Sequence, residues 1–204
     1  MALADTRQPF RLSSEGVGLP GDDFLQPPRT RATRHVAQVT HHVEIQAPPD
    51  AVWPWLVQMG RRRGGWYSWD LLDNGGTRSA DRIVPALQTL AVGDTLPVTA
   101  KGPDGFTVLL LEPERALVVG DAALLPGKAP ASVPATSGTW AFVLEPLGCD
   151  ATLLHERVRI AYEPNLLTLL LRPLLGGIHE LMMWKHLRTL KSRAESRCTA
   201  KEQA

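Results

Sequence analysis

The segment 164–194 constrains the fold more than any other, because it has the pattern of a long helix that is apolar nearly all round. One helical stripe consists of Leu174, Ile178, Leu181 and Met182, and further apolar positions extend it around most of the circumference: Met183, Trp184, Leu187 and Leu190. A helix of this kind must be buried, and in a small domain only a curved sheet can wrap it. The pattern therefore predicts a sheet that grips a C-terminal helix.

Alternation of apolar and polar residues predicts the strands of that sheet. From His35 to Ile45, the positions Ala37, Val39, His41, Val43 and Ile45 share one face at period two. Further strands are predicted at 95–99, 106–111, 116–119, 139–145 and 152–162. Two short helices, 49–59 and 66–72, are predicted after the first strand. We expect an α+β fold with a curved antiparallel sheet of about six to seven strands.

The composition argues against several classes of partner. The chain has 22 Lys plus Arg and 21 Asp plus Glu, so its formal charge of +1 gives no general attraction to nucleic acid. Its longest apolar stretch, 166–175, contains Arg172 and Pro173 and is far shorter than the ~20 residues that span a bilayer. Two cysteines without a CxxC pair fit a reducing compartment. We expect a cytoplasmic protein with no nucleic-acid partner and no membrane span.

Three regions are expected along the chain. Residues 1–34 carry scattered prolines and glycines without a sustained period, which predicts an irregular N-terminal extension. Residues 35–196 form the folded domain, and residues 197–204 form a polar C-terminal tail. Residues 120–138 contain Pro126, Pro130 and Pro134, which predicts a long loop of the kind that is usually functional or mobile.

The element order and several stretches resemble the helix-grip superfamily, which groups START-related lipid-transfer domains and polyketide cyclases and is often labelled SRPBCC. The resemblance covers about 39–195 and includes IQAPPDAVWPWLVQMG, GWYSWDLLDNGG, SADRIVPALQTLAVGD, TWAFVLEP and IHELMMWKHLRTLKSRAE. It implies a long C-terminal helix gripped by the sheet around an apolar cavity. Because members include carriers, cyclases, hydratases and regulators, the resemblance does not choose an activity.

His41 and Glu156 are the candidate acid and base. His41 lies on the apolar face of the first strand, and Glu156 interrupts the apolar face of the strand 152–162. The resemblance implies that these two strands are neighbours, so the side chains would meet and either bind a ligand hydroxyl or transfer protons. A buried polar pair with a structural role is the alternative.

Aromatic and apolar residues are the candidate ligand contacts, because aromatic rings offer large contact areas and stack on ligands. The candidates are Trp66, Tyr67, Phe106, Trp140, Phe142, Tyr162, Ile178 and Met182. For the group Trp66, Tyr67 and Trp69, a gate at the cavity mouth competes with a simple role in core packing. The run Arg61–Arg63 is either a solvated loop or a holder for an anionic head group.

No metal site and no cofactor are expected. His179-Glu180 begins the zinc-protease motif HExxH, but its fifth position is Met183. His179 and His186 are seven residues apart, which is ~10.5 Å along a helix axis and too far for an easy shared metal.

Three functions remain open from the sequence. The first is the binding or carrying of a hydrophobic small molecule, such as a lipid or a polyketide-like compound. The second is a cyclase or dehydratase that uses His41 and Glu156. The third is a protein-interaction or regulatory module whose contacts lie in the extension and in the loop 120–138. The oligomeric state is not predicted.

Overall fold

The fold is a single antiparallel sheet packed against one long helix, and it was obtained as a computed structural model. The structure describes residues 11–12, 19–20, 35–125, 127, 136–162 and 166–202, and within the C-terminal helix it describes the side chains of 176–196. The strands are β1 (Arg11–Leu12), β2 (His35–Ile45), β3 (Thr95–Pro97), β4 (Gly105–Glu112), β5 (Ala116–Gly120), β6 (Ser137–Leu147) and β7 (Ala151–Tyr162). The helices are α1 (Pro49–Val57), α2 (Asp70–Asp73) and α3 (Leu166–Glu202), with short 3-10 helices η2 (Pro85–Leu87) and η3 (Ala122–Leu124).

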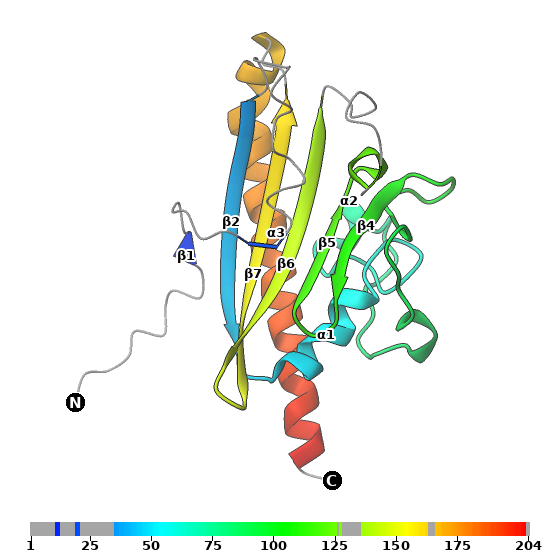
Figure 1. Ribbon diagram of the computed structural model, residues 1–204, viewed down its shortest axis with the longest axis vertical. Helices are drawn as coiled ribbons and strands as arrows, with labels where there is room; N and C mark the ends of the chain where they lie inside the picture. The colour runs from blue at the N-terminus through cyan, green and yellow to red at the C-terminus, as the bar shows by residue number, and fades with distance from the viewer. Residues whose placement is uncertain are drawn as a thin grey trace, which may run out of the picture.

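The seven strands follow the order β1-β2-β7-β6-β5-β4-β3, and every pair is antiparallel. Strand β2 pairs with β7, so the first long strand lies beside the last one. Figure 1 shows α3 running along the face of the sheet behind β2, β7 and β6, with α1 at one end. This arrangement confirms the predicted α+β helix-grip fold.

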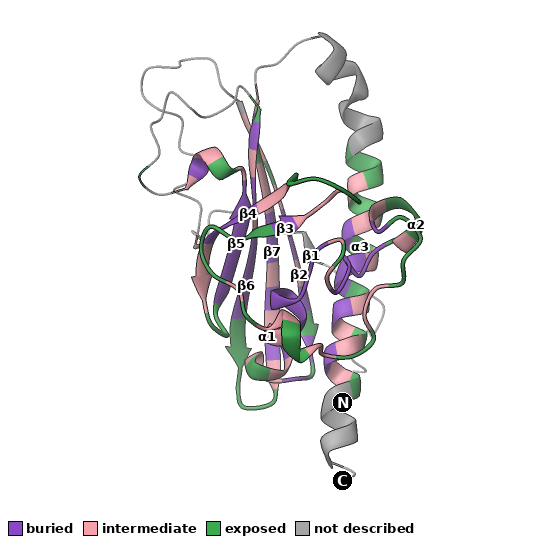
Figure 2. Ribbon diagram, turned by 90° about the vertical axis from the view of Figure 1, so that its right-hand side faces the viewer, coloured by how far each residue is buried: buried purple, intermediate pink, exposed green. Residues whose placement is uncertain are grey.

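Over residues 176–196, where its side chains are described, helix α3 buries one face rather than its whole circumference. Met183, Leu187, Leu190 and Ala194 are buried against the sheet, at the spacing of one helical stripe. Ile178, Leu181 and Trp184, by contrast, are 47%, 54% and 38% exposed. The expectation of a helix buried all round was wrong, because the open sheet covers only one side of it. Figure 2 shows the resulting alternation of buried and exposed patches along α3.

The predicted helix at 66–72 is replaced by an irregular segment and the short α2. Tyr67 has a φ of 56°, which a right-handed helix does not allow. The backbone groups of this segment are instead satisfied by distant side chains: the carbonyl of Trp66 contacts His186, and the amide of Tyr67 donates to Ser79 Oγ. Tertiary contacts therefore override the local apolar spacing.

The two ends of the chain contain more regular structure than the sequence predicts. Arg11 and Leu12, in the expected irregular extension, form β1 and pair with His42 and His41 at the sheet edge. The expected C-terminal tail is helical as far as Glu202. Most of the remaining extension lies outside the described residues. Within the part of the chain that is described, no helix combines the length and the apolarity needed to cross a membrane.

Candidate functional site

A cavity of about 600 Å³ lies between the inner face of the sheet and α3. Helix α3 contributes His179, Met182, Met183 and His186, which fall at i, i+3, i+4 and i+7 and so share one helical face. Strand β6 contributes Trp140 and neighbouring residues, and the irregular segment after α1 contributes Trp66. We call Trp66, Phe106, Trp140 and His186 the cavity floor, and Arg61, Asp73, Asp121 and His179 the cavity rim.

Three aromatic rings make up most of the floor. Trp66 and Trp140 are stacked, with ring centroids 5.6 Å apart and planes at 20°. Phe106 meets both of them edge-on at 5.9 and 5.8 Å. These are favourable aromatic geometries, each worth about 0.5–1.5 kcal/mol beyond area burial, so the rings form a rigid apolar wall.

His186 completes the floor as a buried, neutral imidazole. Its side chain is fully buried, and burial lowers its pKa from 6.5 to about 4. Nδ1 contacts the carbonyl oxygen of Trp66. A carbonyl only accepts hydrogen bonds, so Nδ1 carries the proton, and Nε2 is left with its lone pair and without a partner.

Glu156 lies behind the floor as a protonated carboxyl group. It is fully buried on β7, and its Oε1 accepts a 2.6 Å hydrogen bond from Trp140 Nε1. Burial raises its pKa from 4.5 to about 8; the Trp140 bond opposes the shift and the charge of Glu180 adds to it. At neutral pH the group is therefore mainly uncharged, and its Oε2 has no hydrogen-bond partner.

The predicted pair of His41 and Glu156 is adjacent in register but bonded to other residues. The two lie opposite each other on β2 and β7, so they share the inner face as expected. His41 Nε2, however, lies 2.8 Å from Glu180 Oε2 on α3, while Glu156 is bonded to Trp140. The family resemblance implied that the two strands are neighbours, but it did not indicate Glu180 as the residue that contacts His41.

The rim contains ionisable side chains that are only partly buried, unlike the fully buried His186 of the floor. Asp73 and Arg61 line the cavity beside α2, and burial together with the charge of Asp70 raises the pKa of Asp73 to about 6 despite the opposing charge of Arg61. Burial lowers the pKa of His179, whose Nε2 has no partner. On the sheet side, Asp121 Oδ2 accepts from the amide of Gly138 at 2.7 Å.

The structure divides the predicted ligand contacts into three groups. Trp66, Phe106, Trp140 and Met182 line the cavity. Tyr67 and Phe142 are buried in the core and are absent from the lining. Tyr162 and Ile178 lie outside the lining altogether, and Ile178 is on the exposed face of α3.

Tyr67 has the packing role that was the alternative to a gate. Its ring is 1% exposed and meets Trp55 edge-on at 6.0 Å, while its hydroxyl accepts from Gln58 Nε2 at 2.8 Å. Trp69 is 40% exposed and does not line the cavity.

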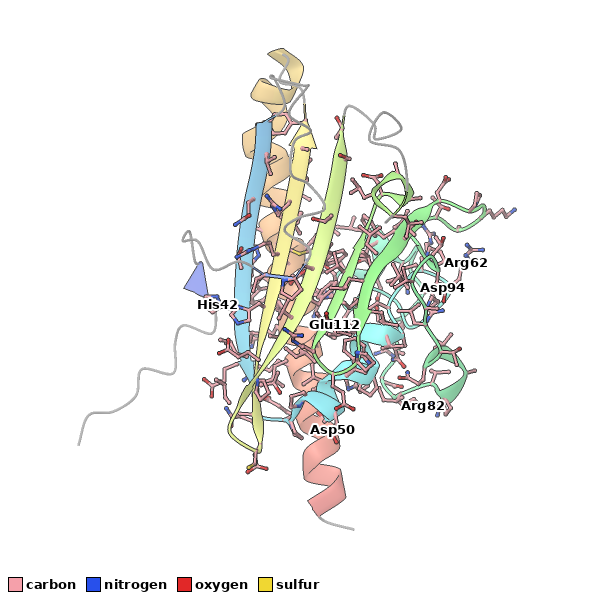
Figure 3. The ribbon with its side chains drawn as sticks, in the orientation of Figure 1. His42, Asp50, Arg62, Arg82, Asp94 and Glu112 are labelled. Carbon is pink, nitrogen blue, oxygen red and sulfur yellow. The ribbon has the colours of Figure 1, made fainter. Side chains whose placement is uncertain are left out.

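The three arginines of the run 61–63 have three different environments. Arg61 reaches the cavity rim, whereas Arg63 donates to the backbone carbonyls of Met59, Val57 and Leu87. Arg62 is exposed, and Figure 3 shows it in the loops at the side of the sheet opposite to His42. Only Arg61 is therefore placed to meet a ligand.

His186 is the site residue that sequence reasoning missed. The histidine was considered only as one half of a metal pair with His179. Its signal was its place on the stripe Met183, Leu187 and Leu190, where a polar residue on a buried helical face requires a partner. Among the described residues, no group of three or more His, Cys, Asp or Glu is placed to hold a metal ion.

Comparisons with known proteins give structural likenesses only. No protein-family model and no curated protein matches the chain. A structural-genomics protein from Mesorhizobium loti is 19% identical over 78% of this chain and 98% of its own, with a TM-score of 0.43. An aromatase/cyclase from Streptomyces sp. R1128 is 16% identical over 80% and 96%, with a TM-score of 0.39. A point mutant of norcoclaurine synthase from Thalictrum flavum, in complex with a transition-state analogue, is 15% identical over 78% and 97%, with a TM-score of 0.42.

At these scores the likenesses carry no weight for function. The helix-grip assignment rests on the strand order and on the position of α3 in this chain.

Proposed function

We propose that this protein binds a mainly apolar small molecule in the cavity between the sheet and α3. The observation that carries the proposal is the cavity of about 600 Å³ with the stacked rings of Trp66 and Trp140 in its wall. Cavities of ~300–1,000 Å³ lined by aromatic side chains with a few polar groups are typical of small-molecule sites. A lipid or a polyketide-like compound fits this description, and binding or carrying is the expected activity.

Filling the cavity tests the proposal directly. Val158 lines it from β7, so Val158→Phe places a ring in the space without adding charge. Val92→Phe is the matched control, because Val92 is 52% exposed and outside the cavity. Binding of the neutral probe N-phenyl-1-naphthylamine is followed by its fluorescence. We expect Val158→Phe to weaken binding at least tenfold and Val92→Phe to leave it unchanged.

Native mass spectrometry of the gently purified wild-type protein gives a second readout. An apolar adduct in the wild type that is lost in Val158→Phe supports the proposal and supplies the ligand class. Equal probe binding by the wild type and both variants contradicts it, because the probe would then bind elsewhere.

Acid–base catalysis on the bound molecule is a second candidate function. The observation that favours it is Glu156, a buried carboxyl hydrogen-bonded to Trp140 of the cavity lining, whose pKa is raised to about 8, so that it holds a proton near neutral pH. His41, opposite Glu156 in register, is the other predicted member of the pair. The compound recovered from the protein is incubated with the wild type, Glu156→Gln and His41→Gln, and its mass is followed. Conversion that survives both substitutions rejects this assignment.

The interaction-module alternative depends on residues 1–34 and on the loop 120–138. Most of these residues lie outside the described part of the chain, so this function stays a prediction. Deletion of 1–34 that leaves partner binding intact counts against it.

A further inference from the structure

The imidazole of His186 presents a hydrogen-bond acceptor at the cavity floor that no protein group uses. Its Nδ1 is occupied by the carbonyl of Trp66, which fixes the tautomer with the proton on Nδ1. Nε2 is buried and has no hydrogen-bond partner, and the residue lines the cavity. A buried acceptor without a partner is costly and uncommon in folded proteins, so its presence at a cavity wall requires an explanation.

Neighbouring groups do not satisfy this nitrogen. The rings of Trp140, Phe142 and Tyr67 surround the imidazole at centroid distances of 5.5, 5.9 and 6.4 Å. The indole N–H of Trp140 donates to Glu156. The Tyr67 hydroxyl accepts from Gln58, and its own O–H does not form a hydrogen bond with Nε2, which has no partner. Because His186 belongs to the cavity lining, the cavity is the place from which a further donor can approach the imidazole.

The charge at the floor selects the kind of donor. The neutral His186 and the protonated Glu156 supply no positive charge to balance an anionic ligand group. The cations of the lining are Arg61 and Arg159, whereas the rings around the imidazole belong to Trp140, Phe142 and Tyr67. A carboxylate at the floor would be desolvated without a counter-charge. An ether oxygen or a carbonyl would face the lone pair of Nε2 with a second lone pair.

We infer that His186 Nε2 accepts a hydrogen bond from a neutral hydroxyl group of the bound molecule, and that this contact makes the site specific for hydroxylated over ether-type or anionic ligands. The inference rests on the proposed function and names the group that the floor recognises. Apolar contacts with Trp66 and Trp140 hold the body of the ligand, and His186 accepts the hydrogen bond from its hydroxyl group.

Matched probes separate the hydroxyl from the rest of the ligand. 2-Naphthol and 2-methoxynaphthalene share one aromatic body and differ in whether the oxygen can donate. Titration calorimetry on the wild-type protein is expected to show about tenfold tighter binding of 2-naphthol, which corresponds to one hydrogen bond. 2-Naphthoate is expected to bind more weakly than either. The hydroxyl preference is expected to disappear in His186→Phe and to return in part in His186→Gln, whose amide oxygen is an acceptor.

His155→Phe is the control variant, because His155 lies on β7 outside the cavity and bonds to Glu145. A direct readout on the wild type does not depend on the folding of any variant. In nitrogen NMR spectra, the Nε2 resonance of His186 should move to lower frequency when 2-naphthol is added and stay in place with 2-methoxynaphthalene.

The outcomes distinguish the inference from the proposed function. Equal binding of 2-naphthol and 2-methoxynaphthalene by the wild type overturns the role of His186 and leaves the cavity as a binding site. A hydroxyl preference that persists in His186→Phe also overturns it. Failure of every probe to bind overturns both.

Discussion

The floor and the rim of the same cavity differ in how deeply their ionisable side chains are buried and in the pKa shifts that result. At the floor His186 is fully buried, as is Glu156 behind it, and burial lowers the pKa of the histidine and raises that of the carboxyl, so both are favoured in the neutral form. At the rim, Arg61 and Asp73 are only partly buried as residues, and the charge of Arg61 opposes the rise in the pKa of Asp73. Burial is the largest cause of the pKa shift at each of His186, Glu156 and Asp73, and the shift away from the charged form is larger for the two fully buried groups.

The two regions are therefore expected to select ligands by different rules. The floor can distinguish ligands that donate a hydrogen bond from ligands that only accept one, because no charged group there competes with that bond. The rim can discriminate by charge, although solvent weakens that preference.

Removing Trp140 should have the largest effect on stability, because this residue both stacks on Trp66 and donates a hydrogen bond to Glu156. We expect Trp140→Ala to lower the free energy of unfolding by about 3 kcal/mol through lost packing. Trp184→Ala is the matched control; Trp184 is 38% exposed on the outer face of α3, and its loss should cost less than about 1 kcal/mol. Urea denaturation measures both, and equal losses would show that the floor is not a tightly packed unit.

The pH dependence of stability should report the neutral state of Glu156. Because its pKa rises from 4.5 to about 8 on folding, the folded protein holds a proton that the unfolded chain has released between these values. The free energy of unfolding must therefore fall as the pH rises through this window. His186 acts in the opposite direction, but only between about 4 and 6.5, and the window of Asp73 ends near 6.

From pH 6.5 to 8, Glu156 contributes to the pH dependence of the free energy of unfolding, whereas His186 and Asp73 no longer do. We expect the wild type to lose up to about 2 kcal/mol over this range and Glu156→Gln to lose less. Urea titrations at the two pH values give the difference. Parallel losses in both proteins would mean that Glu156 is ionised in the folded state.

At the rim, Asp73→Asn should produce a smaller and pH-dependent gain. The raised pKa of Asp73, about 6 against 3.8, destabilises the wild type as the pH rises through this range. After allowance for solvent screening, we expect the stability of Asp73→Asn relative to the wild type to be about 1 kcal/mol greater at pH 7 than at pH 4. Asp81→Asn, at an exposed position, should show no such change.

The contact between His41 and Glu180 should have the smallest effect, because Glu180 is 46% exposed. A double-mutant cycle to alanine is expected to give a coupling of about 0.5 kcal/mol, typical of a partly exposed polar contact. The cycle between His41 and Glu156 should give less. A larger coupling in the second cycle would restore the pairing that the sequence predicted.

The sequence predicted most of the fold because the strands have local signals. The alternation from His35 to Ile45 and the turn at 148–150 before β7 are readable without tertiary information. The segment 66–72 was mispredicted because its backbone is held by Ser79 and His186, residues that local spacing does not reveal.

The candidate site was predicted less completely than the fold. Trp66, Phe106, Trp140 and Met182 were predicted from aromatic or apolar character together with the fold, and they line the cavity. The partner of His41 was missed because strand register is encoded in the alternation, whereas the rotation of α3 against the sheet depends on packing of the whole molecule. The same rotation places Ile178 outside and His186 inside.

His186 and Trp66, which are in contact, are 120 positions apart in the sequence. Ser68, whose Oγ donates to the carbonyl of Met182, is 114 positions from that residue. Both partners in α3 are synthesised after the entire sheet. Until α3 has been synthesised, the aromatic residues of the cavity wall lack the helix that covers them in the folded protein. Contacts of such long sequence separation slow folding, and exposed apolar surface favours aggregation in the meantime. The helix that completes the cavity thus also ends the period in which the nascent chain is most vulnerable to misassembly.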